Sequence, residues 1–186
     1  TALIGNLVRI DNKQGVVVPF RFNKLQRYLF ANKSSRNIIL KFRQGGCTSS
    51  ILADMLIDCI ILPPTQCAVV SHETHATQRL LDRVQFYYDS MGEPKPKMGA
   101  ESRSEKTFPE MHSSIYIGTA GARAFGRGVT IQNLHVSELN FYTDQERIML
   151  ALLQAVPAEG RIFIESTANG VGNFGHSLWK KAKNND

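Results

Sequence analysis

The alternation of strand and helix patterns along most of the chain limits the folds that this sequence can adopt. From Asn37 onward, short apolar segments such as CAVVS and RIFIES alternate with segments of helical periodicity, and turn-forming residues bound the short segments. Such alternation is typical of a mainly parallel sheet with helices on both faces. We therefore expect an α/β protein whose ligands bind beyond the carboxyl ends of the strands.

Periodicity and turn residues also predict where the individual elements lie. The expected strands are residues 15–19, 37–42, 66–71, 114–118, 131–137 and 160–166. The expected helices are residues 25–31, 50–62, 73–91, 146–155 and 173–183. Residues 92–113 are polar and rich in proline and lysine, so we expect a long excursion over the surface there.

Size and charge narrow the class of protein further. The 186 residues are 42% hydrophobic and 20% charged, which suits one globular domain and argues against disorder. Lysine and arginine number 22 against 16 acidic residues, and the net charge of +6 favours a polyanionic partner such as a nucleotide or a nucleic acid. Cys47, Cys59 and Cys67 form no C-x-x-C pair, which argues against a zinc site or a disulfide framework.

The sequence also indicates a cellular setting. The longest apolar segment, residues 51–62, contains Asp54 and Asp58 and is too short to span a bilayer. The N-terminus lacks the pattern of a signal peptide. We therefore expect a soluble, cytoplasmic protein, and a start without Met suggests a domain of a longer chain.

The segment KFRQGGCTS, residues 41–49, follows an expected strand and precedes an expected helix, which is the layout of a phosphate-binding loop. It departs from the usual pattern G-x-x-x-x-G-K-[ST], because Lys41 replaces the first glycine and Cys47 replaces the lysine. Cys47 supplies no cation, so the positive charge for a phosphate would have to come from Lys41 or Arg43, on the strand side. The alternative interpretation is a glycine turn with solvated basic side chains.

The rest of this loop contains the other groups that a phosphate site needs. Gly45 and Gly46 can present backbone N–H groups to phosphate oxygens, and the N-terminus of the following helix favours an anion. Thr48 or Ser49 can present a hydroxyl to Mg²⁺.

A second strand end has complementary chemistry. The segment IQNLHVSEL ends its strand in Ser137 and Glu138, where P-loop ATPases have a Mg²⁺-organising acid and a water-activating carboxylate. Glu138 can polarise an attacking water, whereas the neutral Ser137 hydroxyl can hold a metal only weakly or through water. The alternative for Glu138 is a surface acid that follows a strand.

A third strand end, after RIFIES, has small polar side chains. Ser166, Thr167 and Asn169 can sense a phosphate or a bound water through hydrogen bonds, although a plain Asn-Gly turn is the alternative. Ahead of the second strand end, Arg123 and Arg127 lie among glycines, which lets them approach an anion closely.

Together these strand ends resemble the ATPase domain of the large terminase subunit, the DNA-packaging motor of tailed bacteriophages and related viruses. The matching segments are FNKLQRYLF, LKFRQGGCTSS, VVSHETHATQRLLDRV, the run from GRGVT to HVSEL, and IESTANGVGNFGHSLWKKA. They follow the order of the family and cover most of the chain from Phe20 to Lys183. Many terminases are similar in having K-x-R-Q-x-G-x-[ST] in place of the usual loop.

The resemblance implies a role for each matched residue. Glu138 would be the catalytic carboxylate, Thr48 would bind Mg²⁺, and Ser137 departs from the more usual aspartate of the metal site. The implied ATP-binding residues are Gln26, which would read adenine, and Lys41, Arg43, Gln44, Gly45, Gly46, Cys47, Thr48 and Ser49. The residues implied to couple hydrolysis to movement are Ser166, Thr167 and Asn169.

In this family an arginine commonly completes the site, sometimes from the neighbouring subunit of a ring. Arg127 is our first choice for that catalytic contact, and the alternatives are Arg79, Arg83, Arg103 and Arg123.

The resemblance also implies the organisation and the partners of the protein. Residues 1–186 would form one ATPase domain of the P-loop, RecA-like fold, with the glutamine motif in residues 1–36 and the core in residues 37–186. The implied cofactors are ATP and Mg²⁺. The implied partners are double-stranded DNA, the portal protein of the procapsid, the small terminase subunit and further copies of the chain in a ring, in the host cell cytoplasm; the isolated domain would be a monomer.

Two expectations concern DNA directly. No acidic cluster in the chain suits two-metal cleavage, so we expect no nuclease activity from these residues, the nuclease domain of the family being absent from them. The basic segment from Lys95 to Lys106 is one candidate DNA contact, and a solvated face is the alternative.

Two other functions stay open on the sequence. A helicase or another nucleic-acid translocase would also suit Gln26 and Glu138, and its gene would encode a second RecA-like domain where a terminase encodes a nuclease. A structural module that binds nucleotide but scarcely hydrolyses it would suit Cys47 and Ser137.

Overall fold

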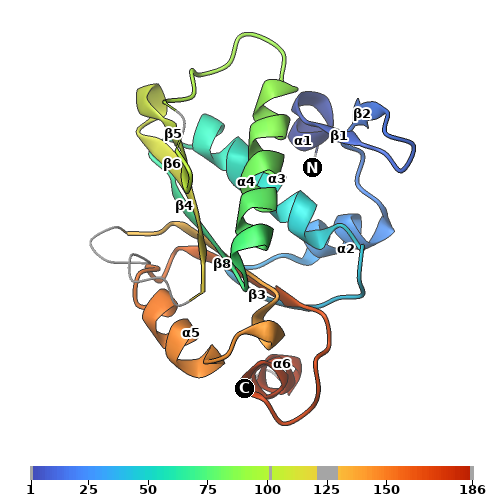
Figure 1. The fold of residues 1–186 in the computed structure, drawn as a ribbon, viewed down its shortest axis with the longest axis vertical. Coiled ribbons are helices and arrows are strands. Elements are labelled where there is room, and N and C mark those ends of the chain that lie inside the picture. Colours follow the sequence, from blue (N-terminus) through green and yellow to red (C-terminus); the bar gives the residue numbers. More distant parts are fainter. Residues whose placement is uncertain (1, 101, 121–129, 185–186) are drawn as a thin grey trace.

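A six-stranded sheet forms the centre of the molecule in the computed structural model, which describes residues 2–100, 102–120 and 130–184 (Figure 1). The strands lie in the order β3-β8-β7-β4-β6-β5. Their bounds are β3 (Arg36–Leu40), β4 (Gln66–Ser71), β5 (Glu105–Phe108), β6 (Ser113–Thr119), β7 (Asn133–Ser137) and β8 (Arg161–Ser166). All neighbours pair in parallel except β5, which is antiparallel to β6. The expected α/β fold with a mainly parallel sheet is therefore confirmed.

Helices cover both faces of this sheet. The described helices are α1 (Ala2–Leu7), α2 (Lys24–Asn32), α3 (Cys47–Ile61), α4 (Thr74–Asp89), α5 (Gln145–Leu153), α6 (Phe174–Asn184) and the short 3₁₀ turns η1 (Pro109–Met111) and η2 (Leu139–Phe141). A two-stranded ribbon of β1 (Arg9–Asp11) and β2 (Val17–Pro19) lies beside α1. None of the helices in the described part is both long and apolar enough to cross a membrane.

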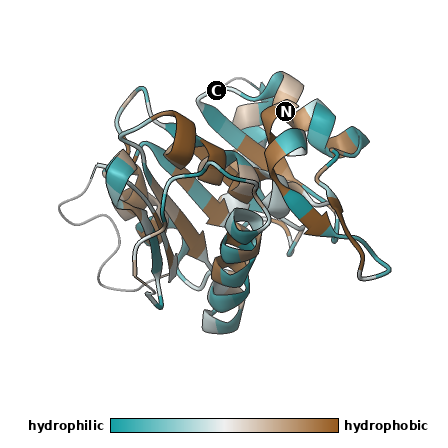
Figure 2. Cartoon of the chain, turned by 90° about the horizontal axis from the view of Figure 1, so that it is seen from above, coloured by the Kyte–Doolittle hydropathy of each residue, from teal (hydrophilic) through white to brown (hydrophobic). Residues whose placement is uncertain are grey.

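Alternate residues of each strand point to opposite faces of the sheet, so they pack into two separate hydrophobic cores, one under each layer of helices. Val69 and Phe163 pack into the core that contains α1 to α4, whereas Val70 and Ile164 pack into the core that contains α5 and α6. Figure 2 shows the strands of the sheet coloured mostly as hydrophobic. This burial on both faces explains why CAVVS and RIFIES read as continuous apolar runs.

The segment 92–113 is the main correction to the expected elements. Instead of one surface excursion, it contains β5, which adds an antiparallel edge to the sheet, and the turn η1. Lys106 lies on β5 with only 8% of its surface exposed, so it does not belong to an exposed basic loop. Lys95 is also engaged, because its Nζ donates to the carbonyl oxygens of Tyr88 and Met91. The segment from Lys95 to Lys106 is therefore not a continuous exposed basic loop, and its contact with DNA stays a prediction.

A buried ionic cluster fixes the C-terminal half of α3 against the beginning of the sheet. Asp54 on α3 pairs with Lys33 at 3.1 Å and with Arg161 at 3.0 Å. Asp58, one turn later, pairs with the same Arg161 and accepts a hydrogen bond from Asn133 at 3.0 Å. Because Asn133 and Arg161 begin β7 and β8, the cluster holds the helix in register with the strands whose other ends form the site described below.

We expect Arg161→Met to lower the free energy of unfolding by about 3 kcal/mol, because two buried carboxylates lose their shared cation. Burial raises the pKa of Asp58, and the Arg161 charge opposes that rise. Without Arg161 the pKa rises further, so the folded variant binds more protons than the unfolded chain. The difference in the free energy of unfolding between the unmodified chain and Arg161→Met should therefore shrink as pH falls to about 4. Urea denaturation between pH 4 and 7 measures this dependence.

Arg147→Met is the matched control for this substitution. Arg147 also pairs with an aspartate, Asp144, but on an exposed surface, so its loss should change the free energy of unfolding by about 0.5 kcal/mol or less. An Arg161→Met variant as stable as this control would show that the cluster does not hold α3.

Candidate functional site

The carboxyl ends of β3, β8 and β7 bring together polar groups that are far apart in the sequence. Lys41 directly follows β3, and its Nζ lies 2.6 Å from Oε1 of Glu138, which directly follows β7. The same Nζ lies 2.8 Å from Oε2 of Glu165, near the end of β8. β8 lies between β3 and β7, so the lysine bridges carboxylates from two strand ends. Lys41 and Glu138, two of the residues that the sequence indicated, thus lie together, and Glu165 is an addition.

Glu165 is the most connected residue of the site, and its side chain is fully buried. Its Oε1 accepts hydrogen bonds from Thr48 Oγ1 at 2.7 Å and from Ser137 Oγ at 2.9 Å. His135, also fully buried, places Nε2 at 3.3 Å from the same oxygen. Sequence reasoning missed both Glu165 and His135. The sequence feature that could have indicated them is a titratable side chain within an otherwise apolar strand, in RIFIES and in NLHVS.

The charges of this cluster stabilise one another. Burial alone would raise the pKa of Glu165, but the interactions with His135 and Lys41 lower it to about 2. Burial alone would lower the pKa of Lys41, but the charges and hydrogen bonds of Glu165 and Glu138 raise it overall. Lys41 and Glu165 are therefore both ionised at neutral pH. Burial and the Glu165 charge raise the pKa of Cys47, so the thiol at the position of the usual lysine is neutral.

Glu138 is held by the residues expected to couple hydrolysis to movement. Its backbone is left-handed, with φ 60°, a conformation that costs a non-glycine residue about 1 kcal/mol or more. Its Oε2 accepts hydrogen bonds from the Thr167 N–H at 3.0 Å, from Thr167 Oγ1 at 3.2 Å and from Ser166 Oγ at 3.4 Å. Asn169 instead donates to the carbonyl oxygen of Asn140 at 2.9 Å. Ser166 and Thr167 therefore contact the carboxylate, whereas Asn169 braces the η2 turn.

The glycine turn between β3 and α3 is supported from α2. Gln26 and Asn23 form a capping box at the start of α2. Gln26 Nε2 then donates to the carbonyl oxygen of Gly46 at 2.8 Å, and Asn23 Nδ2 donates to that of Gly45 at 3.1 Å. Gln26, expected to read adenine, is buried here as the support of the loop, and Asn23 is a second support that sequence reasoning did not identify.

Gly46 is the N-cap of α3 and has φ 78°, which favours glycine. An added Cβ would lie 2.6 Å from Gln26 Nε2, whose position the capping box fixes. We expect Gly46→Ala to lower the free energy of unfolding by about 2 kcal/mol, from backbone strain and from displacement of Gln26. Gly15→Ala is the control, because Gly15 has φ 73° but open space around it, and its cost should be about 1 kcal/mol. If chemical denaturation gave equal losses in the free energy of unfolding for Gly46→Ala and Gly15→Ala, the contact with Gln26 would not contribute to the cost.

The arginines near the loop differ in whether they already form hydrogen bonds or ion pairs within the chain. Arg43 is exposed and has no hydrogen bond or ion pair with any residue that the structure describes. Arg83 on α4 donates from Nη1 to Ser49 Oγ at 3.0 Å, which places this alternative arginine beside the first turn of α3. Arg79 pairs with Glu73 at 3.6 Å. The first-choice arginine, Arg127, lies outside the described residues.

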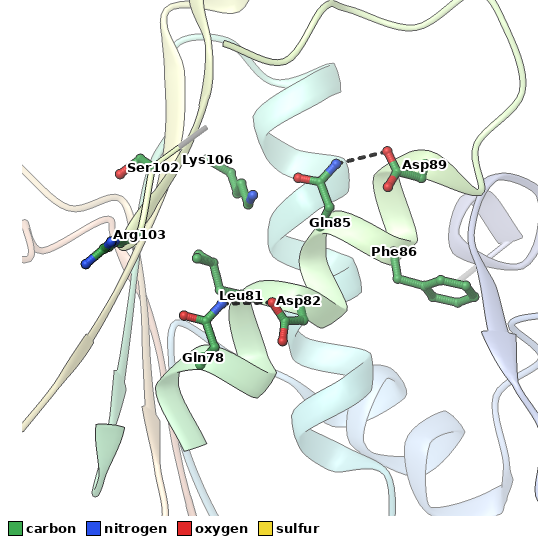
Figure 3. A pocket seen from close by; sticks show the side chains of 9 residues that line it. All are labelled: Gln78, Leu81, Asp82, Gln85, Phe86, Asp89, Ser102, Arg103 and Lys106. Carbon is green, nitrogen blue, oxygen red and sulfur yellow. Dashed lines mark hydrogen bonds between the residues drawn. The ribbon is translucent and has the colours of Figure 1, made fainter. Parts of the chain in front are cut away.

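Arg123 also lies outside the described residues, and the last alternative, Arg103, lines a different hollow, between α4 and the segment before β5 (Figure 3). The lining residues are Gln78, Leu81, Asp82, Gln85, Phe86, Asp89, Ser102, Arg103 and Lys106. Gln78 and Gln85 donate to Asp82 and Asp89 along α4. The hollow therefore contains two carboxylates, Asp82 and Asp89, as well as the basic Arg103 and Lys106.

The strand ends have the donor set that Mg²⁺ prefers. Thr48 and Ser137 contribute hydroxyl oxygens and Glu165 a carboxylate, and each hydroxyl lies within hydrogen-bonding distance of Glu165 Oε1. Mg²⁺ in nucleotide sites takes one or two carboxylates and completes its ligands with phosphate oxygens and water. Among the described residues there is no group of three or more His, Cys, Asp or Glu that could hold a metal ion.

Comparison with known proteins relates this arrangement to solved structures. The chain is similar to the large terminase ATPase domain of Thermus phage P74-26, with a TM-score of 0.70 and 16% identity over 86% of this chain and 69% of that chain. The large terminase of bacteriophage HK97 gives a TM-score of 0.77 at 12% identity, with 100% of this chain but 41% of that chain covered. A DEAD box protein from Methanococcus jannaschii gives 0.58 at 13% identity over 83% and 44%. No protein-family model matches the sequence, and no curated protein does.

These likenesses concern the fold of the chain. The chain has the mixed α/β fold of P-loop-type ATPase domains, with a mostly parallel sheet between helices. Within that class, it has the fold of the ATPase domain of phage large terminases. The resemblance drawn from the sequence is confirmed in the fold, and the chain spans less than half of the HK97 protein.

Proposed function

We propose that this chain is the ATP-hydrolysing motor domain of a viral DNA-packaging terminase large subunit, which drives double-stranded DNA into a procapsid. The observation that supports this most directly is the meeting of Lys41, Thr48, Glu138 and Glu165 at three strand ends. These groups are a cation, a metal-binding hydroxyl and two carboxylates, the combination that phosphoryl transfer to water needs. They lie where parallel α/β sheets bind ligands.

The triphosphate would bind over the glycine turn. Backbone N–H groups from Gln44 to Ser49 and the N-terminus of α3 would receive the phosphate oxygens, and Lys41 and Arg43 would supply the positive charge. Gln26 donates one amide N–H to Gly46 O, and its second amide N–H would be the group that contacts adenine from the α2 side. Bound Mg²⁺ would neutralise charge on the phosphates, and Thr48 would be one of its ligands.

Hydrolysis would use Glu138 as the group that orients and polarises water. Its hydrogen bonds to Ser166 and Thr167 give a direct route by which loss of the γ-phosphate would move the end of β8, and with it Asn169 and η2. An arginine would complete the site, with Arg127 still our first choice and Arg83 the described candidate next to the loop. Where a ring of copies supplies this arginine from a neighbouring subunit, the isolated monomer should hydrolyse ATP slowly.

The other partners follow from the packaging role. Double-stranded DNA would be bound through its phosphates by lysine and arginine, without sequence preference and with strong salt dependence. The portal protein and the small terminase subunit would bind the assembled ring in the host cytoplasm. The alternative of a helicase or translocase core is favoured by the DEAD box likeness at a TM-score of 0.58.

The test of this proposal is ATP turnover by the chain alone, with double-stranded DNA, and with DNA and procapsids. A packaging motor should respond to duplex DNA and most strongly to procapsids, and the response should fall as salt rises. Equal stimulation by single-stranded nucleic acid, with no effect of procapsids, would favour the helicase. Nucleotide binding without turnover in any of these mixtures would favour a structural module.

A further inference from the structure

We propose that Glu165, rather than Ser137, supplies the carboxylate that positions Mg²⁺ in this site, together with the hydroxyl of Thr48. The inference rests on the proposed ATPase function and deepens it, because it assigns the metal-organising acid that the sequence lacks after β7. In the P-loop ATPases that acid ends the strand which here ends in Ser137. In this chain the metal-organising acid would instead lie on the adjacent strand, β8.

The sheet register is the first observation for this assignment. Ser137 on β7 and Glu165 on β8 are direct partners of a parallel pair, so their side chains leave the sheet on the same face. The Ser137 hydroxyl donates to Glu165 Oε1 at 2.9 Å. The carboxylate therefore lies within one hydrogen bond of the place where an aspartate at position 137 would project its own.

The contact with α3 is the second observation. Thr48 Oγ1 donates to the same Glu165 oxygen at 2.7 Å. A hydroxyl has one proton, and when a carboxylate accepts that proton the oxygen lone pairs remain available to a cation. Thr48 and Ser137 thus both keep oxygen lone pairs available to a cation, on the two sides of the Glu165 oxygen to which they donate.

Pairing with Lys41 does not account for all of these contacts. The Lys41 ammonium lies beside Glu165 Oε2, at 2.8 Å, whereas Thr48 and Ser137 contact Oε1. His135 Nε2 approaches Oε1 from within the core, at 3.3 Å, and so fixes the orientation of the carboxylate. A simple counter-ion for Lys41 would need neither the threonine of the loop nor a buried histidine behind it.

The experiment compares the affinity for a non-hydrolysable ATP analogue, AMPPNP, in Mg²⁺ and in EDTA. We expect the unmodified chain to bind more tightly in Mg²⁺ by about 10-fold or more, the effect of one charge-assisted contact. Glu165→Gln, which keeps the size of the side chain, should reduce this difference to within about 2-fold. Ser137→Asp/Glu165→Gln returns a carboxylate to β7 and should restore the dependence on Mg²⁺.

Glu146→Gln makes the same change at an exposed glutamate on α5, so it is the matched control and should leave the Mg²⁺ dependence unchanged. Ser137→Ala tests the other candidate ligand directly, and it should keep most of the Mg²⁺ dependence. Circular dichroism and thermal unfolding show which variants are folded, and the Ser137→Asp/Glu165→Gln protein tests the inference even if Glu165→Gln is unstable. Unchanged Mg²⁺ dependence in folded Glu165→Gln, or its loss in Ser137→Ala alone, would overturn the assignment and leave the ATPase proposal standing. Absence of AMPPNP binding by the unmodified chain would overturn both.

Discussion

Replacing Glu138 with glutamine should lower ATP turnover by about 100-fold to 10,000-fold, the contribution of a well-placed general base. Glu138 is the carboxylate of the site that is not fully buried, with 21% of its side chain exposed, so water can reach it. Glutamine keeps the shape and can still accept hydrogen bonds from Thr167, but it cannot take a proton from water. Single-turnover hydrolysis of radiolabelled ATP measures the loss of the chemical step directly.

The matched control is Glu146→Gln, an exposed glutamate on α5. It removes the same charge without touching the strand ends and should leave turnover unchanged. AMPPNP affinity of Glu138→Gln should stay within about 10-fold of the unmodified chain, because the proposed phosphate contacts lie on the loop. Turnover that persists in Glu138→Gln would show that another group activates the water, and the catalytic assignment would fall.

The sheet could be predicted from the sequence because its strands are covered on both faces. Burial on two sides makes CAVVS and RIFIES continuous apolar runs, and helices separate them, which leaves few alternatives to a parallel sheet. The meeting of Lys41 with Glu138 follows from the same argument, since parallel strands end at one edge. The edge strand β5 was missed because its sequence, EKTF, is short and largely polar and lies in a lysine-rich segment.

The order of strands could not be predicted, and this hid the most connected residue. β8 is late in the sequence but lies between β3 and β7 in the sheet, so Glu165 falls between Lys41 and Ser137. Read along the chain, Glu165 is only the penultimate residue of RIFIES. Likewise, the family resemblance assigned Gln26 to adenine, but no local pattern could show its bond to Gly46, twenty positions away.

The largest effect on binding is expected from neutralising both basic residues ahead of the glycine turn. We expect Lys41→Gln/Arg43→Gln to weaken AMPPNP affinity by about 100-fold or more, because two charge-assisted phosphate contacts are lost. The structure separates the two residues: the Lys41 side chain is 9% exposed and already paired, whereas Arg43 is exposed. Arg43→Gln alone should therefore weaken binding by about 10-fold without a change in stability. Isothermal titration calorimetry measures the affinities.

Lys41 needs a separate comparison, because its loss leaves Glu165 buried beside Glu138 without a cation. Lys41→Gln should lower the free energy of unfolding by about 3 kcal/mol, so binding must be measured at a temperature where the variant is folded. Arg9→Gln/Lys13→Gln removes the same two charges from an exposed part of the β1–β2 ribbon and should bind AMPPNP as the unmodified chain does. If folded Lys41→Gln/Arg43→Gln bound AMPPNP as tightly as that control does, Lys41 and Arg43 would not be the residues that bind the triphosphate.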